Sequence, residues 1–440
     1  MKRTKKALAA LLSVLMLMLT VCPAAFALED TPGKDYTITS PYATVDWDTW
    51  NSYKANLHAH STYSDGEMTL SEVVESYYAK GYDILAVTDH GVLGKTWTEE
   101  AQMMPVIGYY AYIGKYDVLS DLRYEAITTG SDRDGRGMLN VTTGIELNAV
   151  VIRKNHVNGF FCDFGYDYWG EENDYESAVR LNAEAGGITF LNHLGDWTGG
   201  GGDVTKNQDP ETIQFFSDIF VKYPSCVGME IINRIDSVTK HDRVLWDNIL
   251  QVVIPQGRNV FAFSNDDSHC ETDIGLSFET FMMPELTQDA LRTAMENGTF
   301  FACGRRARAE LGDDFFADIY SPYPTVTNIT VNDATNCISV DYVNGDKIEW
   351  VADGVVIAEG NTIDLNDYED EISSYVRFQI RGDGGMCFSQ AFICDDGTLG
   401  EDIEPIYTPT QYPEFIQIII DLLKILWNTK IGALIQKNMD

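Results

Sequence analysis

Histidines at the ends of strand-like segments constrain this chain more than any other feature. The chain has seven histidines, and six of them stand at or just after an apolar run typical of a strand. These six are His58, His60, His90, His156, His193 and His269. His241 is the exception, since it lies in a polar stretch. In a parallel α/β sheet the functional side chains gather at the carboxyl ends of the strands, so this placement predicts one shared site.

The first group of candidate ligands lies in a short N-terminal segment. If residues 54–60 form a strand, His58 and His60 leave the same face of the sheet because side chains two apart point the same way. A Ser-Asp-Gly turn signal folds Asp65 back toward that strand end, and His90 closes the next apolar run. Four candidate metal ligands therefore gather at two strand ends. Taken alone, such a histidine pair more often consists of ordinary core or surface residues.

Later strand-like runs also end in candidate ligands. Glu146 ends an apolar run, where an unpaired buried carboxylate would cost several kcal/mol and a metal ion would satisfy it. His193 ends another such run, and Asp267 and His269 repeat the spacing of two that places both side chains on one strand face. His156 is either a further ligand or a solvated strand residue.

Helical and strand periodicities alternate around the first motif. Apolar residues recur at helical spacing over 70–80, the helix is stopped by Gly81, and a strand follows over 82–88. A strand, a helix and a strand in this order form a βαβ unit. This unit predicts a parallel sheet with its site at the carboxyl ends of the strands.

Five motifs, in their order along the chain, resemble the PHP family, named for polymerase and histidinol phosphatase. They are His58-Ala59-His60-Ser61 with Ser64-Asp65-Gly66, Thr88-Asp89-His90-Gly91, Gly144-Ile145-Glu146-Leu147, Asn192-His193 and Asp266-Asp267-Ser268-His269. The resemblance implies an α/β fold, an irregular or distorted β/α barrel over residues 53–311. It also implies a ligand set in which Glu146 bridges two ions. His58, His60, Glu146 and Asp267 would hold one ion, His156 and His193 a second, and Asp65, His90 and His269 a third.

The number and type of ligands indicate the chemistry. Nine candidates are too many for one ion and suit three divalent ions, and mixed imidazole and carboxylate ligation fits zinc, iron or manganese. Adjacent divalent ions about 3.5–4 Å apart lower the pKa of a shared water and bind both oxygens of an in-line displacement. We therefore expect hydrolysis of a small phosphorylated substrate by a metal-bridging hydroxide. Hydrolysis of an amide or other carbonyl compound, and metal-dependent binding without catalysis, are the alternatives.

Two arginines follow the last expected barrel strand. A guanidinium fork matches the oxygens of a phosphate group, so Arg305, or its neighbour Arg306, is a candidate substrate-binding residue if it reaches the site. The alternative is that the pair belongs to a solvated turn.

The N-terminus predicts export. Four basic residues precede an apolar run and an A-x-A triplet that ends at Ala27, which is typical of a secretory signal peptide over 1–27. A lipoprotein anchor at Cys22 is disfavoured because Val21 is too large for the position before a lipidated cysteine. The mature protein would be secreted or extracytoplasmic, with residues 28–52 as an N-terminal extension.

The charge excludes some partners. The formal net charge is −36, and removal of residues 1–27 would leave 27 basic residues against 67 acidic ones. Such a field repels nucleic acid and anionic lipid, so we expect no nucleic-acid partner. The seven cysteines after residue 27 are widely spaced and indicate no disulfide framework, although Cys387 and Cys394 are close enough in sequence to bridge.

Two segments are expected after the barrel. Short alternating strands over 315–397 favour a small antiparallel β-sandwich, as a packing module or a carbohydrate-binding one. Residues 398–440 read as a linker and a C-terminal amphipathic helix, because polar residues form one narrow stripe over 414–428. Charges within it exclude a membrane span, which needs roughly 20 apolar residues. Docking, self-association and contact with a membrane surface are all open for this helix.

Overall fold

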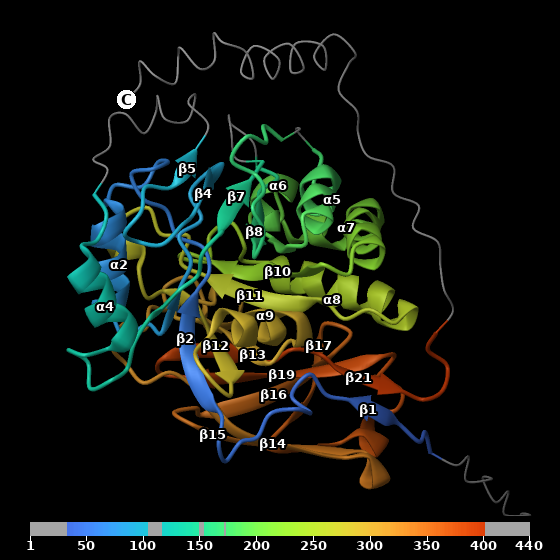
Figure 1. Cartoon of the computed structure of the whole chain (residues 1–440). Coiled ribbons are helices and arrows are strands. Elements are labelled where there is room, and N and C mark those ends of the chain that lie inside the picture. The colour runs from blue at the N-terminus through green and yellow to red at the C-terminus, as the bar shows by residue number, and fades with distance from the viewer. Residues whose placement is uncertain (1–32, 104–116, 149–153, 171–172, 401–440) are drawn as a thin grey trace, which may run out of the picture. The chain divides into compact units, whose positions relative to one another are not determined.

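The computed structural model describes residues 33–103, 117–148, 154–170 and 173–400 (Figure 1). The account below concerns the described residues from Tyr36 onward. The expected signal peptide and the expected C-terminal helix lie outside the described residues. Within the described part of the chain, none of the helices has the length and apolar character needed to cross a membrane.

The predicted βαβ unit is present. Strand β2 (Asn51–Asn56) pairs in parallel with β3 (Ile84–Leu85), which pairs in parallel with β6 (Leu139–Asn140). Helix α2 (Leu70–Ala79) connects β2 to β3. Its N-cap residue is Thr69, whose side chain accepts a hydrogen bond from the backbone N–H of Glu72. The capping residue thus fixes where the helix starts. Both strands are shorter than expected, so His58 and His60 follow β2 instead of lying within it.

A second sheet contains most of the later motifs. Its order is β11 (Phe261–Asn265), β10 (Cys226–Asn233), β9 (Ile188–Leu191), β8 (Val157–Phe160) and β7 (Ile145–Leu147). The three strands β9, β10 and β11 are parallel, whereas β7 and β8 are antiparallel to their neighbours. All eight residues of β10 are buried, as expected of a parallel strand covered on both faces.

Helices and shorter elements surround the two sheets. Helices α5 (Glu176–Glu184), α7 (Pro210–Lys222) and α8 (Asp242–Val253) lie beside the second sheet, and α2 and α4 (Asp121–Thr129) lie near β2 (Figure 1). The remaining helices and strands of this part are β4 (Val92–Leu93), β5 (Gln102–Met103), α6 (Leu194–Thr198), α9 (Gln288–Asn297) and α10 (Arg308–Leu311). Short 3₁₀ turns are η1 (Val204–Gln208), η2 (Ile254–Gln256), η3 (Glu271–Asp273), η4 (Asp333–Thr335) and η5 (Leu365–Tyr368).

Two isolated bridges join the sheets, Ala59 to Ser268 and His90 to Glu146. The described residues do not form one continuous ladder around a barrel. The observed fold is therefore a mixed α/β arrangement of several sheets, which agrees with the expected fold class at that level. The two bridges are made by residues of the predicted motifs, so the sheets meet where the candidate ligands lie.

The segment after residue 315 is more closely joined to the first sheet than expected. Strand β12 (Ser277–Met283), which the sequence pattern did not predict, pairs with β2 and with β13 (Phe300–Gly304), and β13 pairs with β20 (Gly385–Phe388). The large sheet then continues through β19 (Tyr375–Gly382), β16 (Lys347–Ala352), β17 (Val355–Glu359) and β21 (Phe392–Asp395), and β21 pairs with β1 (Thr37–Thr39). A separate sheet holds β14 (Thr325–Asn332), β15 (Cys337–Val343) and β18 (Thr362–Asp364).

Buried polar contacts reinforce this junction. The guanidinium of Arg377, on β19, donates two hydrogen bonds of 2.7 Å to Asp247 on α8. Both side chains are almost fully buried. Removing one partner of a buried ion pair would leave the other charge uncompensated, so the pair resists separation of the two parts. It holds the C-terminal strands against the first part of the chain, and these strands do not form a detached sandwich. Cys387 faces Cys303 across the β13–β20 pair instead of bridging to Cys394.

Arg305, the candidate substrate-binding residue, belongs to the same junction and lies outside the lining of the candidate site. Its side chain is 2% exposed and does not line the candidate site. It donates hydrogen bonds to the backbone carbonyls of Ser321, Gly384 and Ile319 at 2.7, 2.8 and 2.9 Å. Arg306 also lies away from the site and donates to the carbonyl of Asp313. Three converging carbonyl groups, which the sequence pattern does not reveal, hold Arg305 at the junction.

Arg305→Ala is expected to destabilise the fold. The substitution leaves three carbonyl oxygens without their charged donor, which should lower the free energy of unfolding by about 3 kcal/mol. Denaturant unfolding of the variant and of Arg306→Ala gives the comparison. The Arg306 variant loses only an exposed hydrogen bond to Asp313 and a ring contact with the exposed Phe316, so it should stay within about 0.5 kcal/mol of the parent. Equal stability of the two variants would contradict the structural role of Arg305.

Candidate metal centre

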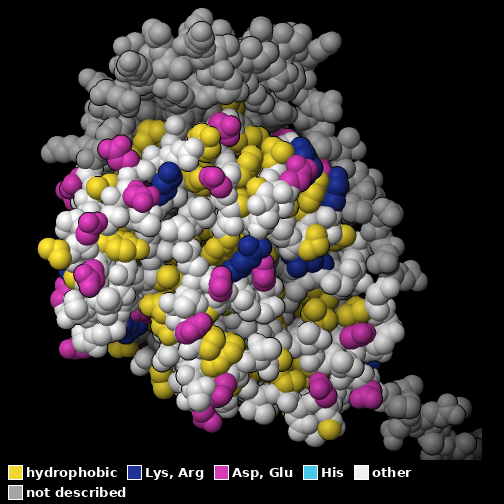
Figure 2. Space-filling model, in the orientation of Figure 1, with side chains coloured by type: hydrophobic (Ala, Val, Ile, Leu, Met, Phe, Trp, Pro, Cys, Tyr) yellow, Lys and Arg dark blue, Asp and Glu magenta, His cyan; other side chains and the backbone are white. Residues whose placement is uncertain are grey.

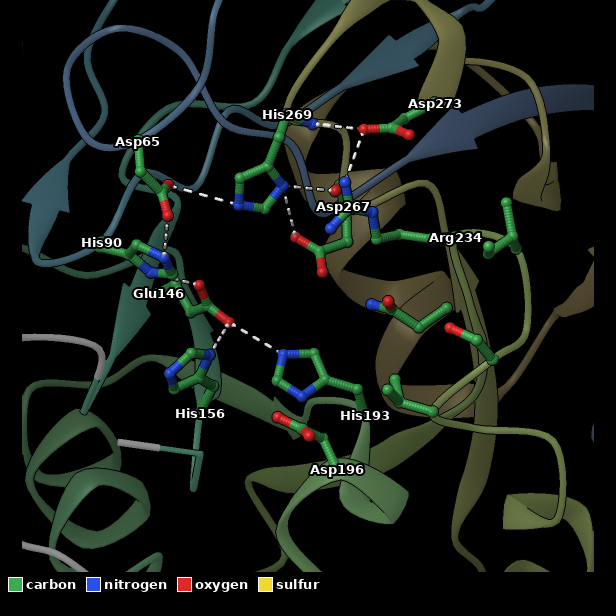
Figure 3. A pocket seen from close by; sticks show the side chains of 14 residues that line it. Asp65, His90, Glu146, His156, His193, Asp196, Arg234, Asp267, His269 and Asp273 are labelled. Atoms are coloured by element: carbon green, nitrogen blue, oxygen red, sulfur yellow. Dashed lines mark hydrogen bonds and ion pairs between the residues drawn. The ribbon is translucent and has the colours of Figure 1, made fainter. Parts of the chain in front are cut away.

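The nine predicted ligands converge on one pocket. Seven of them line a cavity of about 410 Å³, namely Asp65, His90, Glu146, His156, His193, Asp267 and His269 (Figure 3). The other two, His58 and His60, are fully buried and contact the same carboxylates. The side chains come from loops and strand ends of both sheets. The structure thus brings all nine residues together, and their function as ligands stays a prediction.

Glu146 lies at the centre of the cluster. It is the middle residue of β7 and is completely buried. Its two carboxylate oxygens face five imidazoles. The distances are 3.2, 2.9 and 3.5 Å from Oε1 to His58 Nε2, His156 Nδ1 and His193 Nε2, and 2.6 and 3.5 Å from Oε2 to His90 Nδ1 and His60 Nε2. A carboxylate in this position has the contacts required of a ligand shared between ions.

Two aspartates flank Glu146 on the side of His60. Asp267 Oδ1 lies 2.9 Å from His60 Nε2 and 3.3 Å from His58 Nε2. Asp65, which is more exposed, lies 3.3 Å from His269 Nε2 and 3.4 Å from His90 Nε2 through its two oxygens. His269 Nδ1 is 2.9 Å from the carbonyl oxygen of Asp267, a contact that leaves Nε2 turned toward the cluster.

The potential ligands form four overlapping groups. Within each group, one ligand atom per residue lies within 4.8 Å of all the others. The groups are His60, Asp65, His90 and His269; His58, His60 and Asp267; His58, Glu146 and His193; and His90, Glu146 and His156. His58, His60, His90 and Glu146 each belong to two groups. Shared residues of this kind are expected when ions lie next to one another, so the arrangement is compatible with more than one ion.

Buried nitrogen atoms test whether the cluster suits a metal. Among the described residues, His58 Nε2, His60 Nε2 and His193 Nδ1 are buried and have no hydrogen-bond partner of acceptable geometry. Buried polar atoms normally have a partner, because leaving one unsatisfied costs free energy. Imidazole nitrogens accept divalent metal ions readily, and carboxylates lie beside them. The donor set therefore suits divalent ions of the kind predicted.

Burial and close charges shift the proton affinities of the cluster. Burial acts to raise the pKa of Glu146, but the surrounding imidazoles, His156 first, hold it well below its usual range. Burial acts to lower the pKa of His58, yet the nearby carboxylates, Asp267 first, raise it well above. Burial and the positive charge of neighbouring imidazoles lower the pKa of His60 to about 3. These shifts favour the charged forms of Glu146 and His58 and the neutral form of His60, and binding of a metal ion to His58 would displace its proton.

Backbone strain occurs at several of these positions. His193, Asp267 and Arg234 have φ angles of 29°, 41° and 49°, a region that side chains other than glycine rarely adopt. His193 directly precedes α6, which begins at Leu194. Strained residues persist when the surroundings fix them and cluster at functional sites. The local strain is therefore consistent with a site built at these strand ends.

Comparison with known protein families identifies one region of the chain. Residues 56–194 match the model of the PHP domain. The chain contains a PHP domain. The matched region includes seven of the nine candidate ligands, from His58 to His193. Asp267 and His269 lie beyond it and join the cluster through the fold.

Other proteins resemble parts of the chain. A stretch of 37 residues is 49% identical to the DNA polymerase/3'-5' exonuclease PolX of Bacillus subtilis, and it spans 6% of that curated relative. A two-domain protein of Bacteroides vulgatus containing a predicted PHP-like metal-dependent phosphoesterase is 16% identical, with 79% of this chain and 88% of that chain covered at a TM-score of 0.38. The lesion-specific endonuclease PfuEndoQ of Pyrococcus furiosus is 12% identical, with 56% of each chain covered at a TM-score of 0.31.

Residues around the ligands of the PHP domain were not predicted from the sequence. Glu230, on β10, is completely buried, and its Oε1 lies 2.9 Å from His58 Nδ1. Its other oxygen accepts hydrogen bonds of 3.0 Å from the backbone N–H of His193 and the side chain of Asn233. The available signal was a glutamate within an apolar strand, the same signal that identified Glu146. Such partners orient the imidazoles that would bind an ion.

Glu230→Gln is expected to weaken metal binding by about 10- to 100-fold, because partners of this kind orient metal-ligating histidines. Glu279→Gln is the matched control. Glu279 is also a buried glutamate on a strand, but it accepts a hydrogen bond from the backbone N–H of Ser264. Zinc affinity, measured by competition with a chromophoric chelator, should fall in the Glu230 variant and stay close to the parent in the Glu279 variant. An equal loss in both would assign the effect to general loosening of the fold.

Proposed function

We propose that the PHP domain hydrolyses phosphate esters with three bound divalent metal ions. The observation that supports this most directly is the convergence of six imidazoles and three carboxylates on one cavity. A cavity of about 410 Å³ suits a small phosphorylated molecule. We also propose that residues 1–27 direct the protein out of the cytoplasm.

The proposed division of the ligands follows the resemblance to the PHP family. His58, His60, Glu146 and Asp267 would hold one ion, His156, His193 and Glu146 a second, and Asp65, His90 and His269 a third. When bound, divalent ions in such a site lower the pKa of a water molecule and polarise a phosphoryl group. Glu230 and the carbonyl of Asp267 keep the His58 and His269 rings in place for this task.

Arg234 supplies the positive charge that a phosphate needs. Among the described residues that line the cavity, it is the only lysine or arginine. In the view of Figure 3 it lies across the pocket from His90 and His156. Its Nη2 donates a hydrogen bond of 2.8 Å to Asp273, which fixes the side chain beside the cluster. A guanidinium fork held this way would bind and orient the oxygens of a phosphate group.

The charge of the protein limits the size of the substrate. Acidic side chains are scattered over the face drawn in Figure 2, and the formal net charge is −36. Asp196 and Asp273 lie at the pocket itself. A long polyanion such as a nucleic-acid strand would be repelled, whereas a single phosphate group can be held by one arginine and the ions. The proposal is therefore a small phosphomonoester or phosphodiester.

One experiment tests this function. The purified protein is analysed for its metals and assayed with phosphomonoesters, phosphodiesters and amides. Release of phosphate or of a phosphomonoester, lost on chelation and restored by the same metal, would support the proposal. Hydrolysis of amides without any phosphate ester would support the amide and carbonyl alternative instead. Metal binding with no hydrolysis in any class would support a binding protein.

A further inference from the structure

The loop between β10 and α8 has an unusual backbone. Two of its residues, Arg234 and Asp236, have φ angles of 49° and 54° although neither is glycine. Each such residue costs about 1 kcal/mol or more, so the surrounding structure must hold the loop in place. The loop follows directly on Asn233, the last residue of β10, and it enters the wall of the cavity.

A buried carboxylate holds the loop. Asp236 is completely buried and accepts hydrogen bonds of 2.7 and 2.9 Å from both terminal nitrogens of Arg243. It also accepts from the hydroxyl of Thr239 at 2.9 Å and from the backbone N–H of Arg308 at 2.6 Å. Arg243 is itself bound by Glu310. Several charge-assisted hydrogen bonds therefore hold the backbone of the loop. The side chains that the loop presents to the cavity are positioned before any ligand binds.

The positioned side chains include an exposed apolar one. Ile235 is 37% exposed and lines the cavity next to Arg234, and Val238 lines it from the same loop. Of the large hydrophobic side chains that are exposed in the described part of the chain, Ile235 is the one that lines this cavity. A rigid, strained loop that keeps an isoleucine in water beside a polar cluster suggests that a ligand covers it.

We infer that Ile235 and Val238 form a subsite for an apolar leaving group. The inference rests on the proposed phosphoesterase function and names its substrate class, a phosphate ester of an alkyl or aryl alcohol. With the phosphate between Arg234 and the metal ligands, the ester group extends along the same loop onto Ile235. Covering apolar surface contributes about 25 cal/mol per Å², which favours an alkyl or aryl group over a polyol at this position.

The test uses non-hydrolysable phosphonates on the full-length protein with its own metals. Calorimetry compares methylphosphonate with n-butylphosphonate, which differ by three methylene groups. The wild type should bind the butyl compound about tenfold more tightly. Ile235→Ser should reduce this preference to about twofold. Leu122→Ser is the control, because Leu122 is an 81% exposed aliphatic side chain on α4 away from the cavity, and it should keep the tenfold preference.

Esters distinguish this inference from the function on which it rests. The kcat/KM for n-butyl phosphate should exceed that for glycerol 1-phosphate, and Ile235→Ser should lower this ratio about tenfold. Equal affinity of the wild type for both phosphonates would overturn the subsite. The same preference in the wild type and in Ile235→Ser would also overturn it. Cleavage of neither ester nor of any phosphodiester, together with tighter binding of the butyl compound, would overturn the phosphoesterase function and leave the apolar subsite supported.

Discussion

Replacement of both His58 and His60 by alanine is expected to reduce phosphate-ester hydrolysis by at least about 10³-fold. The two imidazoles supply half of the four proposed ligands of one ion, and both face Glu146 and Asp267 at 2.9–3.5 Å. A variant that cannot hold this ion depends on water with a pKa near 15.7, compared with about 7 for metal-activated water. The fold should persist, because its cores are built from apolar strands and helices.

The measurements separate loss of the site from loss of the fold. Phosphate release, metal content and thermal unfolding are compared in the double variant, the parent and His241→Ala. His241 lies before α8, outside the candidate groups, so its variant should keep full activity and metal content. An active double variant would refute the assignment of these two residues. If the double alanine variant does not fold, the same measurements are made on the double variant His58→Gln with His60→Gln, which keeps polar side chains of similar size.

The position of the candidate ligands was largely predictable from sequence, because it depends on local patterns. A histidine or carboxylate that ends an apolar run must come out at a strand end, and parallel strands bring such ends together. His193 illustrates this, since it follows the end of β9, a strand that pairs in parallel with β10, and lies in the cluster. The strand lengths were less predictable. Strand β2 ends before Leu57, because the backbone N–H of Leu57 donates its hydrogen bond to the side chain of Asn265, 208 residues away in the sequence.

Long-range pairing explains most of what the sequence did not indicate. All seven residues of β12 are buried, so the strand has no alternating pattern, and Glu279 interrupts its apolar character. This strand pairs with β2 and β13, and β13 pairs with β20. The pairings join two segments between which the change in composition had predicted a domain boundary at residues 311–315. Arg234 was not singled out from the sequence for a similar reason. Arg305 and Arg234 both follow buried strands, and only the fold shows which one faces the cavity.

Arg234→Ala is expected to lower kcat/KM for phosphate esters by about 10²-fold. Removing a positioned donor to charge that develops in a transition state typically costs about 10²–10³ in rate. The guanidinium would also orient the phosphate group, so Arg234→Lys should recover part of the loss, since an ammonium keeps the charge but not the fork. Arg306→Ala is the matched control, because that arginine contacts Asp313 away from the cavity and its loss should leave kcat/KM within twofold.

An indirect effect through Asp273 has to be distinguished from a direct one. Asp273 accepts hydrogen bonds from Arg234 and also from the backbone N–H of His269, at 2.8 and 3.0 Å, so a change at Arg234 reaches a proposed ligand. Metal content and metal affinity of the Arg234 variant decide between the two. If both match the parent while kcat/KM falls, the guanidinium acts on the phosphate itself. If metal affinity falls in proportion to kcat/KM, Arg234 acts by keeping His269 in place. Unchanged kcat/KM would exclude either role and leave the phosphate to be held by the metal ions alone.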